Sequence, residues 1–181
     1  MSKLDNDILK VCISEKELDE MITKVANQIN KDFDGKNPLF IGVLKGSVPF
    51  MTDLMKKITI PCTMDYIKVS SYSGTKSTGN IIIKGDFPDI IGRNVVIIED
   101  ILDTGRTLSK VLELMRTEGA QSVTLCVLLD KPDGRVVPIE ADYVGGLVPN
   151  EFVVGYGLDY DEKYRNLPYI GVLKEEVYKN N

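Results

Sequence analysis

The sequence predicts an α/β fold with a mostly parallel central sheet flanked by helices. The segment "VVIIEDILDTGRT", residues 95–107, opens with four apolar residues that do not alternate with polar ones, which is typical of a parallel strand covered on both faces. Other apolar runs alternate along the chain with segments of helical spacing, as in βαβ units. With 181 residues, 43% of them hydrophobic, the chain is expected to form one main core.

The first elements are indicated by a helix start and a strand–loop–helix pattern. "SEKE" at residues 14–17 is a capping box, and apolar residues follow at helical spacing, so we expect a helix to about Lys31. "PLFIGVLKGSVPFMTDLMKKI" then predicts a strand over 39–43, a tight loop over 44–47 and a helix over 48–57.

The following elements continue the alternation. A strand is expected over 63–69, followed by the polar segment "SSYSGTKSTGN" and a short strand over 81–84. After the quoted strand, apolar residues at helical spacing predict a helix over about 107–118, and "SVTLCVLLD" predicts a buried strand over 122–130. The pattern then changes to short strands and turns, which we expect to pack on the core or on the amino-terminal segment.

The quoted strand is expected to end at two adjacent acids, Glu99 and Asp100. Burying an unpaired carboxylate is costly, so the pair is expected at the carboxyl edge of the sheet, where solvent, a metal or a polyhydroxyl ligand can satisfy it. The alternative is a strand that simply ends in solvated acids.

The turn "DTGRT", residues 103–107, lies between this strand and the next helix. A glycine-containing turn that enters a helix presents unpaired N–H groups and the positive end of the helix dipole, which together bind anions. The alternative is that Asp103 or Thr107 only caps the helix. With the acidic pair just upstream, the turn predicts a site for a phosphorylated sugar.

Composition excludes several classes of function. A formal charge of −5 argues against non-specific nucleic-acid binding, and the chain has neither an apolar stretch long enough to span a membrane nor a signal peptide, so we expect a cytoplasmic protein. Cys12, Cys62 and Cys126 show no paired metal spacing and are expected to be reduced. Because the chain has no histidine, a His-based triad is excluded and a transition metal is unexpected, whereas Mg²⁺ remains compatible.

The segment "VVIIEDILDTGRT" resembles the phosphoribosyl-pyrophosphate motif of type I phosphoribosyltransferases. The resemblance implies that Glu99 and Asp100 contact the ribose hydroxyls. It also implies that the 5′-phosphate is held by the turn residues Asp103, Thr104, Gly105, Arg106 and Thr107. Arg106 stands where many relatives carry lysine, which preserves the charge but changes the geometry.

Two further segments resemble the 6-oxopurine branch of this family, the hypoxanthine-guanine phosphoribosyltransferases. "GVLKGS" resembles the pyrophosphate loop, with Lys45 and Gly46 at its tip and a cis peptide expected between Leu44 and Lys45; it lacks the residue order of a Walker loop. "SSYSGTKSTG" resembles the flexible catalytic loop, with Ser71 and Tyr72 closing over the reacting centre, although alone it would indicate only a polar hairpin loop.

The carboxyl-terminal third resembles the purine site of the same branch. In "LLDKP", Lys131 would donate to the purine 6-oxo group. In "EFVVGYGLDYDEKYRNLPYIG", Phe152 would stack on the base, the backbone at Val153 and Asp159 would read its edge, and Arg165 would bind pyrophosphate. Taken alone, Lys131 could be solvated and Phe152 could belong to the core.

The implied reaction is Mg²⁺-dependent transfer of the phosphoribosyl group to hypoxanthine or guanine. The resemblance implies that Glu99, Asp100 and Asp159 hold the metal and that Asp103 handles a proton at nitrogen 7 of the base. The alternatives are a xanthine-preferring enzyme and a non-catalytic regulator that senses phosphoribosyl pyrophosphate.

The resemblance also implies an organisation for the whole chain. We expect residues 1–181 to form a single phosphoribosyltransferase domain, with a core over about 14–130 and a small hood built from residues 1–13 and 131–181. Small-molecule substrates, no nucleic acid and no membrane are expected as partners, and a homodimer or homotetramer is expected from the family.

Overall fold

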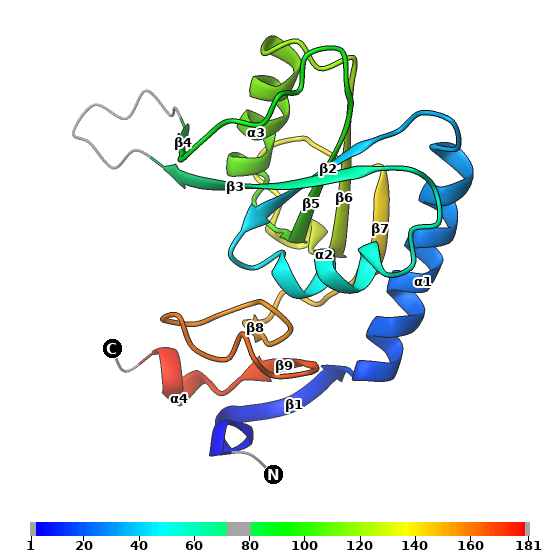
Figure 1. The fold of residues 1–181 in the computed structure, drawn as a ribbon. Coiled ribbons are helices and arrows are strands. Elements are labelled where there is room, and N and C mark those ends of the chain that lie inside the picture. Colours follow the sequence, from blue (N-terminus) through cyan, green and yellow to red (C-terminus); the bar gives the residue numbers. More distant parts are fainter. Residues whose placement is uncertain (1–2, 72–80, 180–181) are drawn as a thin grey trace, which may run out of the picture.

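The computed structural model describes residues 3–71 and 81–179, which form a main sheet with helices on both faces and a smaller sheet beside it (Figure 1). The strands of the main sheet have the spatial order β4-β3-β2-β5-β6-β7. All neighbours in this sheet are parallel except β3 and β4, which are antiparallel. The strands span Leu39–Leu44 (β2), Thr63–Ser71 (β3), Ile81–Lys84 (β4), Asn94–Leu102 (β5), Ser122–Asp130 (β6) and Tyr143–Leu147 (β7). The expected α/β class and the mostly parallel sheet are therefore confirmed.

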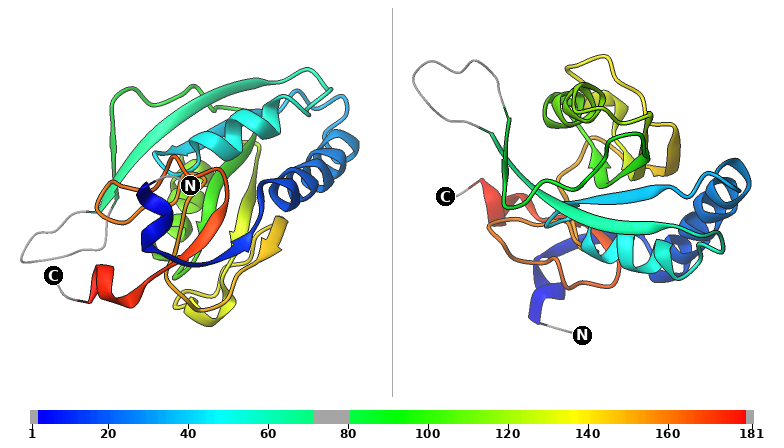
Figure 2. Two further views of the ribbon diagram at one scale, coloured as in Figure 1. Left: turned by 90° about the horizontal axis from the view of Figure 1, so that it is seen from below. Right: turned by 45° about the horizontal axis from the view of Figure 1, so that its top comes forward.

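Helices cover the two faces of this sheet. α1 (Glu15–Asp32) and α2 (Val48–Met55) lie on one face, and α3 (Arg106–Thr117) lies on the other, as the right-hand view of Figure 2 shows. Because successive strand residues point to opposite faces, Val96 and Ile98 pack with the buried residues of α1 and α2, whereas Val95 and Ile97 pack with those of α3. All four are fully buried, which explains the absence of polar alternation in this strand.

The two ends of the described chain form the smaller sheet, which we call the hood. β1 (Ile8–Ile13) and β8 (Val153–Val154) both pair antiparallel with β9 (Ile170–Leu173), which lies between them. A 3-10 turn, η1 (Lys3–Asp7), precedes β1, and the short helix α4 (Glu175–Tyr178) follows β9. The hood lies below the main sheet in Figure 1.

Two boundaries differ from the sequence prediction. β5 does not end at Glu99 and Asp100 but continues to Leu102, because its ladder with β6 extends to the pair Leu102–Asp130. The main sheet also continues beyond residue 130 through β7. β7 contains two glycines and shows little apolar pattern. At one of these glycines, Gly145, β7 lies close to β6, since a Cβ there would be 2.5 Å from the carbonyl oxygen of Leu128. The core therefore extends later in the chain than we expected.

Between β6 and β7, the chain forms a second 3-10 turn, η2 (Pro132–Gly134). Within residues 3–71 and 81–179, every helix is too short or too polar to cross a lipid bilayer.

The capping box predicted at the start of α1 is present. The Ser14 Oγ accepts a hydrogen bond of 3.3 Å from the Glu17 N–H, and a Glu17 carboxylate oxygen accepts one of 2.8 Å from the Ser14 N–H. The Ser14 hydroxyl also donates to this carboxylate at 2.6 Å, and the hydrogen bonds from the hydroxyl and from the Ser14 N–H lower the pKa of Glu17. They satisfy donors that the first turn of a helix otherwise leaves unpaired.

We predict that Ser14→Ala lowers the free energy of unfolding by about 1 kcal/mol, because it removes this cap. Urea denaturation of both proteins measures the difference, with Lys24→Ala, on the exposed side of the same helix, as the control. Since the pKa of Glu17 is lowered in the folded state, its contribution is present above its ordinary pKa and is lost as the pH falls through the folded pKa. The difference in free energy of unfolding between the wild type and Ser14→Ala should therefore become smaller as the pH is lowered. A larger difference at low pH would contradict the role of Glu17 in the cap.

Candidate functional site

The predicted acidic pair and phosphate turn lie at one edge of the main sheet. β2 and β5 are parallel neighbours, so the loop after β2 and the turn after β5 leave the sheet side by side. A cavity of about 290 Å³ opens there. It is lined by the ends of β2, β3 and β5 and by the start of α3, through Val43, Leu44, Val69, Glu99, Asp100, Ile101, Asp103, Thr104, Gly105, Thr107 and Leu108. A larger hollow of about 710 Å³ lies beside α1 and α2, but no predicted site residue lines it.

Glu99 and Asp100 place two carboxylates in this cavity. Burial raises the pKa of both groups, and the neighbouring charge of Asp100 raises that of Glu99 further, while Arg165 opposes the shift at Asp100. The Asp100 carboxylate lies directly against Gly46, since a Cβ at Gly46 would be 1.6 Å from Asp100 Oδ2. Any larger residue at that position of the loop would therefore displace the Asp100 carboxylate.

The turn from Asp103 to Thr107 enters α3 without a side-chain cap. Gly105 is the N-cap residue, with a φ of 77°, so neither Asp103 nor Thr107 caps the helix, and that alternative is wrong. The turn is braced by residues 136 and 137, whose N–H groups each donate to the Thr104 carbonyl at 3.0 Å. The first N–H groups of α3 therefore have no side-chain cap and could donate to an anion beside the acidic pair. Arg106 is exposed on the first turn and does not line the cavity.

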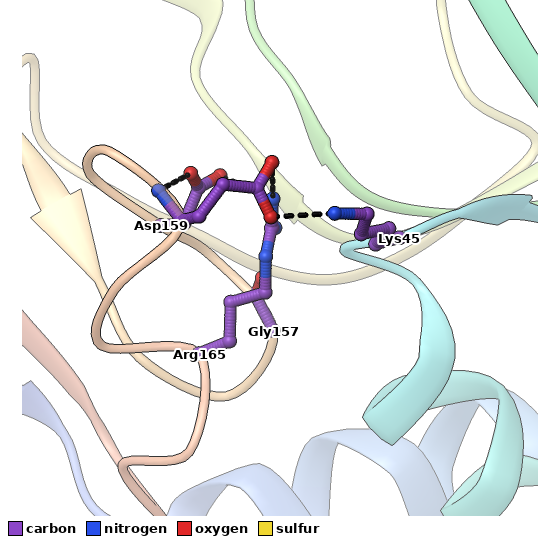
Figure 3. A network of polar contacts seen from close by, with 5 residues as sticks. Lys45, Gly157, Asp159 and Arg165 are labelled. Atoms are coloured by element: carbon purple, nitrogen blue, oxygen red, sulfur yellow. Dashed lines mark hydrogen bonds and ion pairs between the residues drawn. The ribbon is translucent and has the colours of Figure 1, made fainter.

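Lys45 and Arg165 approach each other from the core and the hood (Figure 3). The peptide bond between Leu44 and Lys45 is cis, as the resemblance implied. Arg165 donates to the Gly157 carbonyl at 2.7 Å and forms an ion pair of 2.9 Å with Asp159. Two positive side chains are thus available for an anion next to the cavity.

The predicted purine-site residues lie on two elements. Lys131 follows β6 directly, and its Nζ lies 3.6 Å from Asp103 Oδ2 and 3.4 Å from the Glu151 carbonyl oxygen. Phe152 and Val153 belong to the hood, where Val153 is buried and Phe152 is 38% exposed. Lys131 therefore lies beside Asp103, and Phe152 lies on the hood.

The predicted flexible loop falls largely outside the described residues. Ser71 is the last residue of β3, whereas Tyr72 lies outside the part of the chain that the structure describes.

Comparison with known proteins assigns the family. The family model for the phosphoribosyl transferase domain matches residues 14–161. The chain belongs to this family. It is 56% identical over 179 residues to a hypoxanthine-guanine phosphoribosyltransferase of Streptococcus pneumoniae, covering 98% of this chain and 99% of that protein.

Two further relatives extend the comparison. The chain is 58% identical over 177 residues to the bifunctional protein TilS/HprT of Listeria innocua, with 97% of this chain but only 27% of that protein covered. The crystal structure of a hypoxanthine phosphoribosyltransferase from Staphylococcus aureus superposes with a TM-score of 0.93 at 47% identity, covering 98% and 97% of the two chains.

Two residues that sequence reasoning missed connect the elements around this cavity. The Glu162 carboxylate bridges the two cations, at 2.6 Å from Lys45 Nζ and 3.5 Å from Arg165 Nη2. Its pKa is lowered, chiefly by the hydrogen bond from Lys45. Nothing in the sequence distinguishes this acid from its neighbours.

The second missed residue is Arg135, which connects the ends of β5 and β6. It forms an ion pair with Asp130 and donates to the Asp103 carbonyl at 3.2 Å. Arg135 follows the turn η2, and its partners become visible only once the two strands are placed side by side.

We predict that Glu162→Gln tightens the binding of inorganic pyrophosphate by up to about fivefold, because an incoming anion no longer competes with a carboxylate for Lys45 and Arg165. The limit follows from exposed ion pairs, which contribute about 0–1 kcal/mol. Isothermal titration calorimetry at fixed ionic strength measures the affinity.

Asp161→Asn is the matched control for this prediction. It removes the same charge one residue away, from an exposed acid that pairs with Lys163 rather than with Lys45. An equal gain in both variants would show that net charge, and not the Glu162 contact, sets the affinity.

Proposed function

We propose that this protein transfers the 5-phosphoribosyl group from phosphoribosyl pyrophosphate to hypoxanthine or guanine, giving IMP or GMP and pyrophosphate in purine salvage. The observation that carries the proposal is the single cavity in which a carboxylate pair faces an uncapped, glycine-led helix start. Carboxylates suit sugar hydroxyls and the helix start suits a phosphate. The names of the Streptococcus and Staphylococcus relatives support the same substrates.

Three tasks fall to the residues in the cavity and beside it. Lys45 and Arg165 would neutralise the charge that develops on the departing pyrophosphate. Glu99 and Asp100 would accept hydrogen bonds from the ribose hydroxyls while the sugar acquires cationic character. The residues from Asp103 to Thr107 would hold the 5′-phosphate at the start of α3, so the anomeric carbon is positioned between the leaving group and the base.

The base would be read by residues from both sheets. Asp103 would take the proton from nitrogen 7, and its carboxylate is 44% exposed and therefore accessible to a base in the cavity. Lys131, next to Asp103, would donate to the 6-oxo group. Phe152 would stack on the ring, and the backbone at Val153 and Asp159 would contact its edge.

Mg²⁺ fits the donor set of this edge. Within residues 3–71 and 81–179, no group of three or more acidic or cysteine side chains is arranged to hold a metal. Mg²⁺, however, usually binds through one or two carboxylates together with water and substrate phosphates. Glu99 and Asp100 would supply those carboxylates, and the ion would neutralise charge on the donor's pyrophosphate. Asp159 would join them only after releasing Arg165, with which it is paired.

The cellular setting is part of the proposal. Cys12, Cys62 and Cys126 are all free thiols, which supports a reducing cytoplasm. A homodimer or homotetramer follows from the family resemblance alone, and sedimentation equilibrium of the purified chain would test it.

The test is an absorbance assay with phosphoribosyl pyrophosphate and each of hypoxanthine, guanine, xanthine and adenine, with and without Mg²⁺. We expect nucleotide from hypoxanthine or guanine, and loss of the reaction when the metal is removed with EDTA. A clear preference for xanthine would replace the proposed substrates. Donor binding without turnover on any base would indicate a sensor of phosphoribosyl pyrophosphate.

We predict that Asp103→Asn lowers kcat by about 100-fold or more, because an amide cannot accept the purine proton. Steady-state kinetics with hypoxanthine measures the loss, and the melting temperature should change little. Asp133→Asn, at an exposed acid of η2, removes the same charge nearby and should leave kcat unchanged. Wild-type kcat in Asp103→Asn would remove Asp103 from the mechanism.

A further inference from the structure

A cluster of three aromatic rings surrounds the residue proposed to stack on the base. The ring of Phe152 is stacked on that of Tyr178, with 4.9 Å between centroids and 23° between planes. Tyr160 meets Phe152 edge-on, at 5.7 Å and 88°, and lies 6.4 Å from Tyr178. Both geometries are favourable arrangements for aromatic pairs. One face of the Phe152 ring is therefore covered by Tyr178 from the carboxyl-terminal helix.

The ring of Tyr178, which covers this face, is itself held by the hood. Tyr178 packs with the buried hood cluster of Val154, Tyr164, Leu167 and Leu173. α4 lies at one end of the hood, to the left of β9 in Figure 1. Phe152 is nevertheless 38% exposed, so its side chain is not fully enclosed, and Tyr178 stacks on only one of the two ring faces. A planar ring offers two faces, and the open one is available to a planar ligand.

The backbone places the two rings in a fixed relation. The Leu173 N–H donates to the Phe152 carbonyl at 2.9 Å, and the chain then turns from Leu173 directly into α4. The start of α4 is tied to the amino-terminal turn, because Lys174 donates from its N–H to the Asp7 carbonyl at 2.9 Å and from Nζ to the Asn6 carbonyl at 2.6 Å. The start of α4 is thus fixed by hydrogen bonds, and Tyr178, at the other end of this four-residue helix, contacts Phe152.

We propose that Tyr178 is a positioning residue for the purine base, which holds the plane of the Phe152 ring so that its open face is ready to stack on the base. The inference rests on the proposed function, in which Phe152 contacts the base. A free phenyl ring would have to lose rotational freedom when the base binds, and a ring already stacked on Tyr178 loses less. Tyr178 itself does not touch the base.

The test compares KM values for the base and for phosphoribosyl pyrophosphate in Tyr178→Ala, Tyr178→Leu and Tyr178→Phe. Tyr178→Ala should raise KM for hypoxanthine about two- to tenfold, the range for one aromatic pair, with KM for the donor unchanged. Tyr178→Leu keeps apolar packing against the hood but loses the flat ring, so it should show the same increase even if the alanine variant is unstable. Tyr178→Phe should behave like the wild type.

Lys179→Ala is the control on the same helix, because Lys179 is exposed and pairs only with Glu175 at 2.7 Å among the contacts described. A lower or unchanged KM for the base in both Tyr178→Ala and Tyr178→Leu would overturn the inference, since Tyr178 would then obstruct the base or be indifferent to it. Equal increases for both substrates would also overturn it, by showing a general loss of structure. If the proposed function is wrong, the wild-type protein itself forms no nucleotide from any base. That result differs from those above, and it would also remove the positioning role of Tyr178.

Discussion

The close approach of three segments at Gly46 is the constraint on which the rest of the site depends. On one side the Asp100 carboxylate occupies the space of a missing side chain, since a Cβ at Gly46 would lie 1.6 Å from its Oδ2. On the other side, the loop between β8 and β9 packs against Gly46, since a Cβ at Gly157 would lie 2.0 Å from the Gly46 carbonyl oxygen. Gly157 has a φ of +100°, which other residues rarely adopt. The acidic pair, the loop of Lys45 and the hood are therefore packed against one another around Gly46.

This packing places the acidic pair of β5 and the cations Lys45 and Arg165 near each other, but in separate positions. The acids of β5 lie within the sheet edge, where burial raises their pKa values, while the cations sit where the core loop meets the hood. Lys45 and Arg165 keep acidic partners of their own, Glu162 and Asp159. For a chain of net charge −5, a highly anionic donor must be attracted by such local cations rather than by the overall field.

Much of the core could be predicted because its signals are local. The strand over 122–130 and the short strand over 81–84 appear with the expected bounds, and the capping box marks the start of α1. The motif of β5 and its turn indicated which side chains gather at the sheet edge, because strand, acids and helix start are consecutive. Here sequence order and spatial order coincide.

The hood and the links between elements could not be predicted in this way. Glu162 acts through Lys45, more than a hundred positions earlier in the chain, and Arg135 acts through the ends of two strands. Tyr178 is a single aromatic residue near the end of a polar segment, and only its stacking on Phe152 distinguishes it. β7 was missed because its glycines, which permit close packing on β6, remove the apolar pattern that would announce a strand.

The pairing of β1 with β9 has a consequence for the order in which the protein can fold during synthesis. Ile8 pairs with Leu173, so the hood joins a strand that is synthesised before the main sheet to one that is synthesised after it. The main sheet consists of neighbouring segments that can assemble while synthesis continues, whereas β1 must wait without its partner until β9 emerges. The hood strands can therefore pair only after all the residues that line the cavity have been synthesised.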